Sequence, residues 1–197
     1  MSYFLDKKIK IIALATCHNR KKYTINSISS LYKSIFSHNI ELKIYIVDDG
    51  STDGTTKAIK KKFKDVNIIV GNGNLFWCRG MLHGYKELIK KEKHFDFILT
   101  FNDDVSFFKP FLKGLLSEFY KNKKLNSSLI IVGSTRDAST KKINQGGLKK
   151  INFLNPISLK LITNIKKDKI CDTFNMNCVL IHKSVIKKIG FLSNEYT

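Results

Sequence analysis

The chain of 197 residues lacks long hydrophobic runs and lacks the cysteine patterns that hold metals or form disulfide frameworks. The apolar run nearest the amino terminus, Ile11 to Ala15, is too short for a signal peptide or a membrane span, and no later run is long enough either. The four cysteines have no C-x-x-C spacing and no histidines at zinc-site intervals. These absences argue against a zinc knuckle or a disulfide-rich exported domain, and they favour the reducing cytosol.

Common nucleotide- and calcium-binding signatures are also missing. No G-x-x-x-x-G-K-[ST] motif occurs, and the stretch GNGNLFWCRG has Phe76 where a dinucleotide-binding fingerprint requires glycine. The stretch DGSTDG begins like an EF-hand loop, but Lys60 stands where the twelfth loop position requires glutamate. The sequence therefore argues against a P-loop nucleotide site, a Rossmann cofactor site and an EF-hand.

Acidic residues are scarce, at 16 against 35 basic ones, which gives a formal net charge of +19. The lysines fall mostly at polar positions and ends of predicted helices, a pattern typical of solvated surfaces rather than of a nucleic-acid site. Only three of the basic residues are arginines, and Arg20, Arg79 and Arg136 each lie in or beside a loop after a predicted strand. A guanidinium in such a loop can bind a phosphate or a carboxylate through two hydrogen bonds.

Strand-like and helix-like segments alternate up to about residue 135. The apolar patterns predict buried strands at residues 9–16, 42–49, 66–70, 95–101 and 128–135. They predict helices at residues 25–36, 55–63, 81–93 and 110–121. This alternation predicts a single α/β domain with a mostly parallel sheet and helices on both faces.

The pattern changes after Thr135. Residues 141–156 are predicted to form a hairpin, with Gly146 and Gly147 in or near its turn, and residues 177–191 to form a strand and then a helix. No internal repeat or low-complexity tail is present. The last third is therefore expected to add a smaller, mixed region to the sheet.

Polar side chains gather where the predicted strands end, which is where open α/β sheets bind ligands. They are Thr16, Asn19, Arg20, Asp48, Asp49, Asn72, Asn74, Arg79, Asn102, Asp103 and Asp104. Two pairs of these are adjacent carboxylates, whose mutual repulsion a divalent cation such as Mg²⁺ or Mn²⁺ offsets. A cation that keeps open positions would in turn bind a diphosphate. Taken singly, each aspartate pair is equally typical of a turn and a helix N-cap.

The order of the motifs resembles that of family 2 glycosyltransferases of the GT-A fold. The motifs are ALATCHNR, IYIVDDGSTDGT, GNGNLFWCRGM, ILTFNDDV, IIVGST, INQGG and DTFNMNCVLIHKSVIKKIG. The resemblance is greatest to the bacterial polysaccharide-building, rhamnosyltransferase-like branch, and it covers nearly the whole chain. It implies a Rossmann-like nucleotide-sugar-binding region at 1–135 and, in the same domain, the start of an acceptor-side region at 136–197.

The resemblance also implies roles for individual residues. Thr16 matches a family contact to the nucleotide, Asp49 a hydrogen bond to the base, Asp103 an acid near the ribose and Asp104 a metal ligand. Arg79 lies in the family's glycine-rich stretch, and we expect it to contact phosphate. The candidate nucleotide-sugar residues are Thr16, Asn19, Arg20, Asp48, Asp49, Asn74, Arg79 and Asp103, and the candidate ligands of Mg²⁺ or Mn²⁺ are Asp104 and Asp103.

The implied reaction moves a sugar, with inversion, from a nucleotide diphosphate sugar to a glycan or lipid-linked hydroxyl acceptor. Inversion requires a carboxylate base, which in the family follows the segment matching IGFLSNEYT. We expect that base beyond Thr197, with Glu195 and Asp172 as weaker candidates. An end at this point is expected to expose apolar side chains around Val179, Ile181, Ile186 and Phe191 and to favour homo-oligomers.

Three functional hypotheses remain open from the sequence. The first is a metal-dependent glycosyltransferase of polysaccharide synthesis, cytoplasmic and peripheral to the inner face of an anionic membrane. The second is a nucleotide-sugar-binding remnant without turnover. The third, disfavoured by the dispersed lysines, is a basic nucleic-acid module, whose affinity would fall steeply with salt. The donor base, the sugar and the acceptor cannot be read from these loops.

Overall fold

The computed structural model of the chain describes residues 8–123, 128–152, 154–155, 157–164 and 170–193. The central elements are β1 (Ile9–Cys17), α1 (Lys21–Lys33), β2 (Ile40–Asp48), α2 (Thr55–Lys62), β3 (Asn67–Val70), α3 (Phe76–Lys91), β4 (Phe97–Phe101), α4 (Phe111–Asn122), β5 (Ile130–Val132), β11 (Cys178–His182) and α5 (Lys183–Ile189). The remaining strands are β6 (Thr135–Arg136), β7 (Ile143–Gln145), β8 (Gly147–Lys150), β9 (Leu159–Leu161) and β10 (Thr173–Phe174).

The central sheet has six strands in the order β3-β2-β1-β4-β11-β5. Its first four strands are mutually parallel, and β11 runs antiparallel to both β4 and β5. The predicted mostly parallel sheet is confirmed. The position of β11 was not predicted, because the last strand in the sequence inserts between two strands that precede it by dozens of residues.

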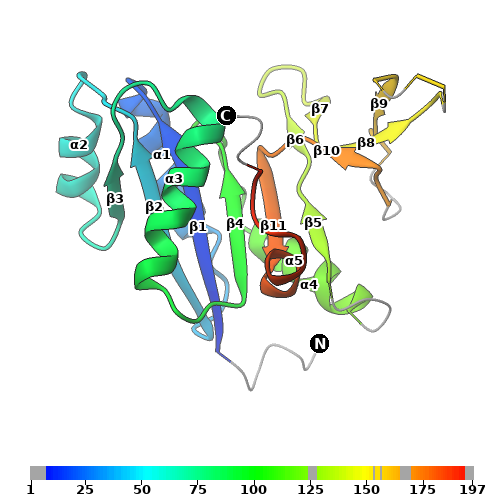
Figure 1. Cartoon of the computed structure of the whole chain (residues 1–197), viewed down its shortest axis with the longest axis horizontal. Helices are drawn as coiled ribbons and strands as arrows, with labels where there is room; N and C mark the ends of the chain where they lie inside the picture. Colours follow the sequence, from blue (N-terminus) through cyan, green and yellow to red (C-terminus); the bar gives the residue numbers. More distant parts are fainter. Residues whose placement is uncertain (1–7, 124–127, 153, 156, 165–169, 194–197) are drawn as a thin grey trace.

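Helices cover both faces of this sheet, as the alternation of segments predicted (Figure 1). Odd-numbered residues of β1, such as Ile11 and Ala13, pack with α1, α2 and α4, where Ile28 and Leu116 are fully buried. Even-numbered residues such as Leu14 pack with α3 and α5 on the other face. Because side chains alternate along a strand, the single strand β1 supplies both cores. This buried centre holds the ends of the strands in fixed positions.

Helix α3 begins at Phe76, five residues before the predicted start at Met81. The glycines and asparagines before Phe76 are typical of loops, so the sequence placed the start of the helix too late. Phe76 itself has a left-handed φ of 54°. Two glycines of the helix lie close to the sheet. A Cβ on Gly80 would lie 2.7 Å from Cγ2 of Thr16, and one on Gly84 would lie 2.6 Å from Cγ2 of Val47. Their missing side chains allow α3 to approach β1 and β2 closely.

The last third forms two small antiparallel sheets, β6-β7 and β10-β8-β9. The predicted hairpin at 141–156 is wrong in its pairing, because β7 pairs with β6 while β8 pairs with β9. The strands on either side of Gly146 thus belong to different sheets. The antiparallel pairs of consecutive strands are instead β6–β7 and β8–β9. Glycine marked a change of sheet here rather than a turn.

The expected exposure of apolar residues near the carboxyl end is also wrong. Val179 and Ile181 lie in β11 at the centre of the sheet and are buried, as is Ile186 of α5. Phe191 stacks on Tyr85 of α3 with 4.5 Å between ring centroids. The insertion of β11 between β4 and β5 is what buries this segment.

Among the residues the structure describes, no helix is both long and apolar enough to cross a membrane.

Candidate nucleotide-sugar site

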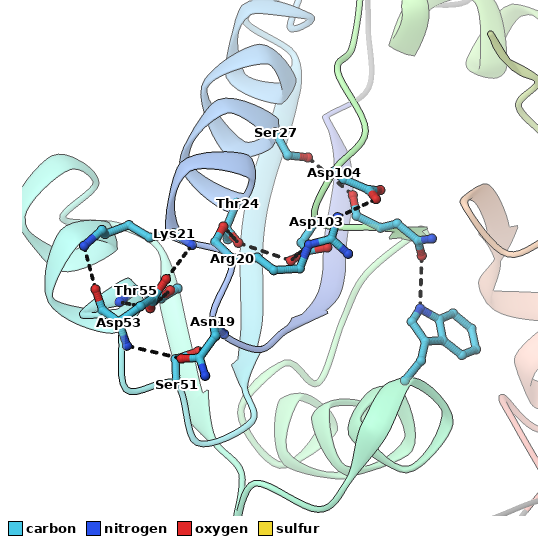
Figure 2. Close-up of polar contacts among 12 residues, drawn as sticks. Asn19, Arg20, Lys21, Thr24, Ser27, Ser51, Asp53, Thr55, Asp103 and Asp104 are labelled. Carbon is cyan, nitrogen blue, oxygen red and sulfur yellow. Dashed lines mark hydrogen bonds and ion pairs between the residues drawn. The ribbon is translucent and has the colours of Figure 1, made fainter. Parts of the chain in front are cut away.

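The carboxyl ends of β1, β2 and β4 bring three polar loops to one edge of the sheet, and the loop after β3 joins them. The loop after β1 hydrogen-bonds to the loop after β2, where Asn19 N–H donates to Ser51 Oγ over 2.9 Å. It also contacts the loop after β4 through Arg20 and Asp104. Segments more than 80 residues apart in the sequence therefore meet at this edge (Figure 2).

Arg20 joins the acidic pair that follows β4. Its Nη2 donates to Oδ2 of Asp104 over 2.7 Å, and its Nε lies 3.6 Å from Oδ2 of Asp103 (Figure 2). Its guanidinium also lies over the ring of Tyr23, 5.2 Å from the centroid. The sequence placed Arg20 on the rim but did not show that it would pair with these two aspartates. The Arg20 side chain, in the loop after β1, thus neutralises part of the negative charge in the loop after β4.

The two aspartates of this pair differ in exposure. The side chain of Asp104 is 40% exposed, whereas Asp103 is buried and accepts a hydrogen bond from Thr24 Oγ1 at 3.3 Å. Burial raises the pKa of Asp103 to about 6, because the opposing effect of Arg20 is too small and Asp104 adds repulsion. Asp104 is therefore the member of the pair that can reach a ligand in solvent.

Asn19 and Asp53 fasten the loops after β1 and β2 to each other. Asn19 has a left-handed φ of 51°, and its Oδ1 accepts hydrogen bonds from the N–H groups of Thr52 and Asp53 at 2.7 and 3.2 Å. Asp53 accepts from the N–H of Lys21, the first residue of α1, at 3.0 Å. It also accepts from Thr55 N–H at 2.9 Å. Asp53 thus accepts from the first N–H group of both α1 and α2, although the N-cap residues of these helices are Arg20 and Gly54.

Asp48 and Asp49 are both buried and both bond to protein groups. Asp48 accepts hydrogen bonds from Ser51 N–H at 2.9 Å and from the hydroxyl of Thr56. Asp49 accepts three from the backbone N–H groups of the loop after β3, namely those of Gly73 at 2.8 Å, Leu75 at 2.9 Å and Phe76 at 3.1 Å. In this structure the carboxylate expected to contact the base holds the next loop in place.

Trp77 and Asn102 connect the start of α3 to the acidic pair Asp103–Asp104, a contact that the sequence did not predict. Trp77 Nε1 donates to Oδ1 of Asn102 at 3.0 Å, immediately before Asp103. The neighbouring Phe76 ring is exposed, and the guanidinium of Arg79 lies 5.8 Å from its centroid. The feature of the sequence that could have indicated this contact is the aromatic pair Phe76–Trp77 in an otherwise polar stretch. These contacts place an exposed ring and a cation beside the rim.

The other predicted site residues lie as follows. Asn74 is exposed in the loop after β3, and its N–H donates to Asn72 Oδ1 at 3.0 Å. Thr16 is the penultimate residue of β1, and its Oγ1 is buried without a hydrogen-bond partner, 2.8 Å from where a Cβ on Gly80 would lie. Arg136 lies in β6, where it donates to the carbonyl of Lys141 at 2.9 Å. Arg136 is thus bound within the β6–β7 hairpin.

The two weaker candidates for a catalytic base differ in what can be said of them. Glu195 lies outside the described residues. Asp172 lies beside the small sheet, where it accepts from Lys150 N–H at 2.9 Å and pairs with Lys149 Nζ at 3.2 Å. These hydrogen bonds lower the pKa of Asp172, which makes it a poorer base.

The residues at this edge can hold a divalent cation only together with a ligand. Over the described parts of the chain, no cluster of three or more histidine, cysteine or acidic side chains is arranged to hold a metal. Asp104 nevertheless offers a solvent-accessible hard oxygen beside a second carboxylate. Mg²⁺ is commonly bound by one or two carboxylates, with phosphate oxygens and waters completing its shell. The donor set fits such a shared site.

An α/β sheet with a polar, acidic rim of this kind is the architecture of a nucleotide-binding enzyme domain. A profile of "Glycosyl transferase family 2" matches residues 13–190, most of the chain. The chain belongs to this family, and the family resemblance seen in the sequence is thereby confirmed. A search of curated proteins finds no significant match.

Solved structures share the fold at low sequence identity. The crystal structure of S. aureus TarS residues 1–349 matches with a TM-score of 0.60 and 17% identity, over 91% of this chain and 49% of that one. The same protein in complex with UDP-GlcNAc matches at 0.52 and 20%, over 70% and 37%. The mannosyltransferase PcManGT from Pyrobaculum calidifontis, in complex with GDP-Man and Mn²⁺, matches at 0.57 and 10%, over 91% and 46%. The GT-A fold is thus confirmed, and the chain spans about half the length of TarS 1–349 and PcManGT.

Proposed function

We propose that the chain transfers a sugar from a nucleotide diphosphate sugar to a hydroxyl acceptor with inversion, as a step in cell-surface polysaccharide synthesis. The observation that carries the proposal is the pair Asp103–Asp104 beside Arg20 at the carboxyl ends of the parallel strands. TarS binds UDP-GlcNAc and PcManGT binds GDP-Man, and both share this fold. Their ligands support a nucleotide sugar as the donor class here and leave the base and the sugar open.

In the proposed donor complex, Asp104 and Asp103 would hold Mg²⁺ or Mn²⁺. The cation would act as a Lewis acid that stabilises negative charge on the departing diphosphate. The Mn²⁺ in the PcManGT complex is consistent with this assignment. Because no group of three or more acidic, histidine or cysteine side chains among the described residues is arranged to hold a metal, the affinity for metal should depend on the nucleotide that shares it.

Other rim residues would position the donor. Asp49 holds the loop after β3, which leads into the first turn of α3, where the Phe76 ring and the Arg79 side chain are exposed. We assign Arg79 to the diphosphate and Phe76 to stacking against the base or sugar, since an aromatic face and a cation suit those two partners. Asp49 retains unoccupied acceptor capacity for a base N–H, because a carboxylate can accept about four hydrogen bonds.

A general base must remove the proton of the acceptor hydroxyl on the face opposite the leaving diphosphate. Asp172 is a weak candidate because its carboxylate already accepts from Lys149 and Lys150. We keep the proposal that the base lies beyond Thr197, with Glu195 and Asp172 as weaker candidates. The predicted division into a donor region at 1–135 and an acceptor side at 136–197 likewise stays a proposal.

Calorimetric titration with UDP, GDP and dTDP, with and without Mn²⁺, tests the donor site. We expect one nucleotide to bind in a Mn²⁺-dependent manner, and Asp104→Asn to abolish that dependence without altering the melting temperature. Glu118→Gln, on the surface of α4, is the matched control and should bind as the parent does. Equal Mn²⁺-dependent affinity in Asp104→Asn and the parent would refute the metal assignment.

Asp49→Ala separates nucleotide contact from metal contact. We expect nucleotide affinity to weaken by about 1–3 kcal/mol, the cost of removing a charged hydrogen-bond acceptor, with the response to Mn²⁺ retained. Loss of the Mn²⁺ response instead would place Asp49 in the metal site. Because Asp49 also holds the loop after β3, protection of the Leu75 amide from hydrogen exchange should fall in this variant.

Binding without turnover is a second candidate. It is favoured by the pairing of every described carboxylate at the rim, since Asp48, Asp49, Asp53, Asp103 and Asp104 each bond to a protein group. Intact nucleotide-sugar binding with neither hydrolysis nor transfer to any acceptor would favour this candidate over the transferase.

A further inference from the structure

The segment around the β8–β9 hairpin combines positive charge with exposed apolar side chains. Residues 138–167 contain seven lysines and no aspartate or glutamate. In the same segment Leu154 is 92% exposed and Ile157 83%, with Ile151 and Leu159 also exposed. We call these four side chains the hairpin tip. They make up four of the eleven large hydrophobic residues exposed in the described parts of the chain.

Local hydrogen bonds close the loop of the hairpin and leave these side chains outside it. Ile151 N–H donates to the carbonyl of Ser158 at 3.0 Å, and Ser158 N–H donates to that of Asn155 at 3.1 Å. The side chains of Asn152 and Asn155 accept from the N–H groups of Leu154 and Ile157 at 2.9 and 3.1 Å. These four bonds stay within the segment, while the side chains of Leu154 and Ile157 are exposed.

Lysines flank the tip in a way that an anionic partner would stabilise. Lys149 and Lys160 are directly opposite each other in the β8–β9 pair. Like charges at opposed positions destabilise a sheet, and Lys149 has Asp172 as one counter-ion at 3.2 Å. A cavity of about 480 Å³ lies past the end of β9 that is away from the tip, lined by Arg136, Thr140, Lys141, Lys142, Ile143 and Thr163. Its charged side chains are all cationic.

We propose that the hairpin tip docks the protein onto an anionic phospholipid surface. Aliphatic side chains gain free energy on entering the acyl boundary, and flanking lysines gain from anionic headgroups. The cationic cavity lined by Arg136 and Lys142 would receive a lipid phosphate. Apolar burial and basic residues together supply the two signals that stable but reversible membrane attachment requires. This proposal does not depend on the proposed transferase activity.

Vesicle sedimentation tests the proposal with the 197-residue chain. We expect binding to vesicles of phosphatidylglycerol and phosphatidylcholine in equal amounts, and little binding to phosphatidylcholine alone. Leu154→Ser with Ile157→Ser should lower the partition coefficient by about tenfold or more, because both side chains lose their burial in the acyl region. Val70→Ser with Ile189→Ser is the matched control, since these residues are 71% and 73% exposed on other elements; it should bind as the parent does.

The lysine contribution needs its own pair of variants. Lys142→Gln with Lys160→Gln should weaken binding by about fivefold per lysine and reduce its sensitivity to salt. Lys187→Gln with Lys188→Gln, on α5, removes the same charge elsewhere and should have a smaller effect. All variants change exposed side chains, so unchanged melting temperatures are expected.

Three outcomes would overturn the proposal. One is equal loss of vesicle binding in the tip variant and its control, which would make the attachment a general effect of surface composition. Another is self-association of the parent that the tip variant abolishes while vesicle binding persists, which would make the tip an interface between copies. The third is retention of single-stranded DNA, but not of vesicles, through the same side chains.

Discussion

The two ends of the parallel strands each hold a buried carboxylate with cationic neighbours, yet the two carboxylates are stabilised differently. At the carboxyl ends, Asp103 has Arg20 at 3.6 Å and Asp104 beside it. At the amino ends, Glu92 follows α3 and accepts from Lys10 Nζ at 2.6 Å, Tyr45 Oη at 2.7 Å and Lys43 Nζ at 3.0 Å.

The pKa values of these two acids move in opposite directions. Burial opposes ionisation at both, and it raises the pKa of Asp103 to about 6. At Glu92 the hydrogen bonds from Lys10, Tyr45 and Lys43 outweigh burial and lower the pKa to about 2. Three close donors outweigh burial at Glu92, whereas at Asp103 burial and the repulsion from Asp104 outweigh the guanidinium of Arg20 and the hydroxyl of Thr24.

This difference separates a structural carboxylate from one suited to a ligand. Glu92 is satisfied by the folded chain and stabilises it, whereas Asp103 is ionised at a cost that an added cation would offset. Perturbed carboxylates of the second kind are typical of functional sites. The comparison supports the rim, rather than the opposite end of the sheet, as the place where a ligand binds.

The largest expected effect is on stability at the amino ends. Glu92→Ala leaves Lys10 and Lys43 near each other and the Tyr45 hydroxyl without this acceptor, so we expect a loss of about 2–4 kcal/mol. Urea denaturation followed by circular dichroism measures it. Glu87→Ala removes an exposed i,i+3 partner of Lys90 on the same helix and should leave the midpoint unchanged. Equal midpoints for Glu92→Ala and the parent would show that the buried cluster is not stabilising.

The same glutamate predicts acid sensitivity. Its pKa is lowered on folding from 4.5 to about 2, so its contribution is present above pH 4.5 and is lost as the pH falls toward 2. The free energy of unfolding of the parent should fall over this window. In Glu92→Gln the slope should be smaller, by about one proton. Identical slopes in the two proteins would mean that Glu92 titrates normally in the folded state.

Asp103→Asn should change the free energy of unfolding in the opposite direction, making the protein more stable at neutral pH. The pKa of Asp103 is raised on folding from 3.8 to about 6, so the parent loses stability as the pH rises through that window. At pH 7 the variant should be more stable by about 1–3 kcal/mol, since Asn can still accept from Thr24. Thermal unfolding at pH 4 and pH 7 measures the change. A destabilised Asp103→Asn at pH 7 would show that Arg20 compensates this charge after all.

The smallest effect is expected at Asp104. Its pair with Arg20 is about 40% exposed on both sides, and such pairs contribute about 0–1 kcal/mol. Asp104→Asn should therefore alter urea stability little while removing Mn²⁺-dependent nucleotide binding. A large destabilisation by this substitution would make Asp104 a structural acid like Glu92 and would weaken the contrast between the two ends.

Local patterns in the sequence predicted the elements that are buried or strongly periodic. The strands 9–16 and 95–101 and the helix after Pro110 lie within a few residues of β1, β4 and α4. The sequence patterns gave wrong boundaries where a glycine or an asparagine serves packing between elements rather than a local turn. Gly80 permits close packing of α3 on β1, and Gly146 separates two sheets, so neither marks the local break that its type suggests.

The sequence by itself determined that the acids would follow the strands, because apolar runs ended by aspartates and asparagines define both the sheet and its polar rim. Only the tertiary structure decided which partners those acids have. Asp49 bonds to the loop after β3, Arg20 reaches across to Asp104, and Glu92, unremarkable in sequence, collects three donors from β1 and β2. Pairing between segments 24 to 84 residues apart depends on the order of strands in the sheet, and no local pattern encodes that order.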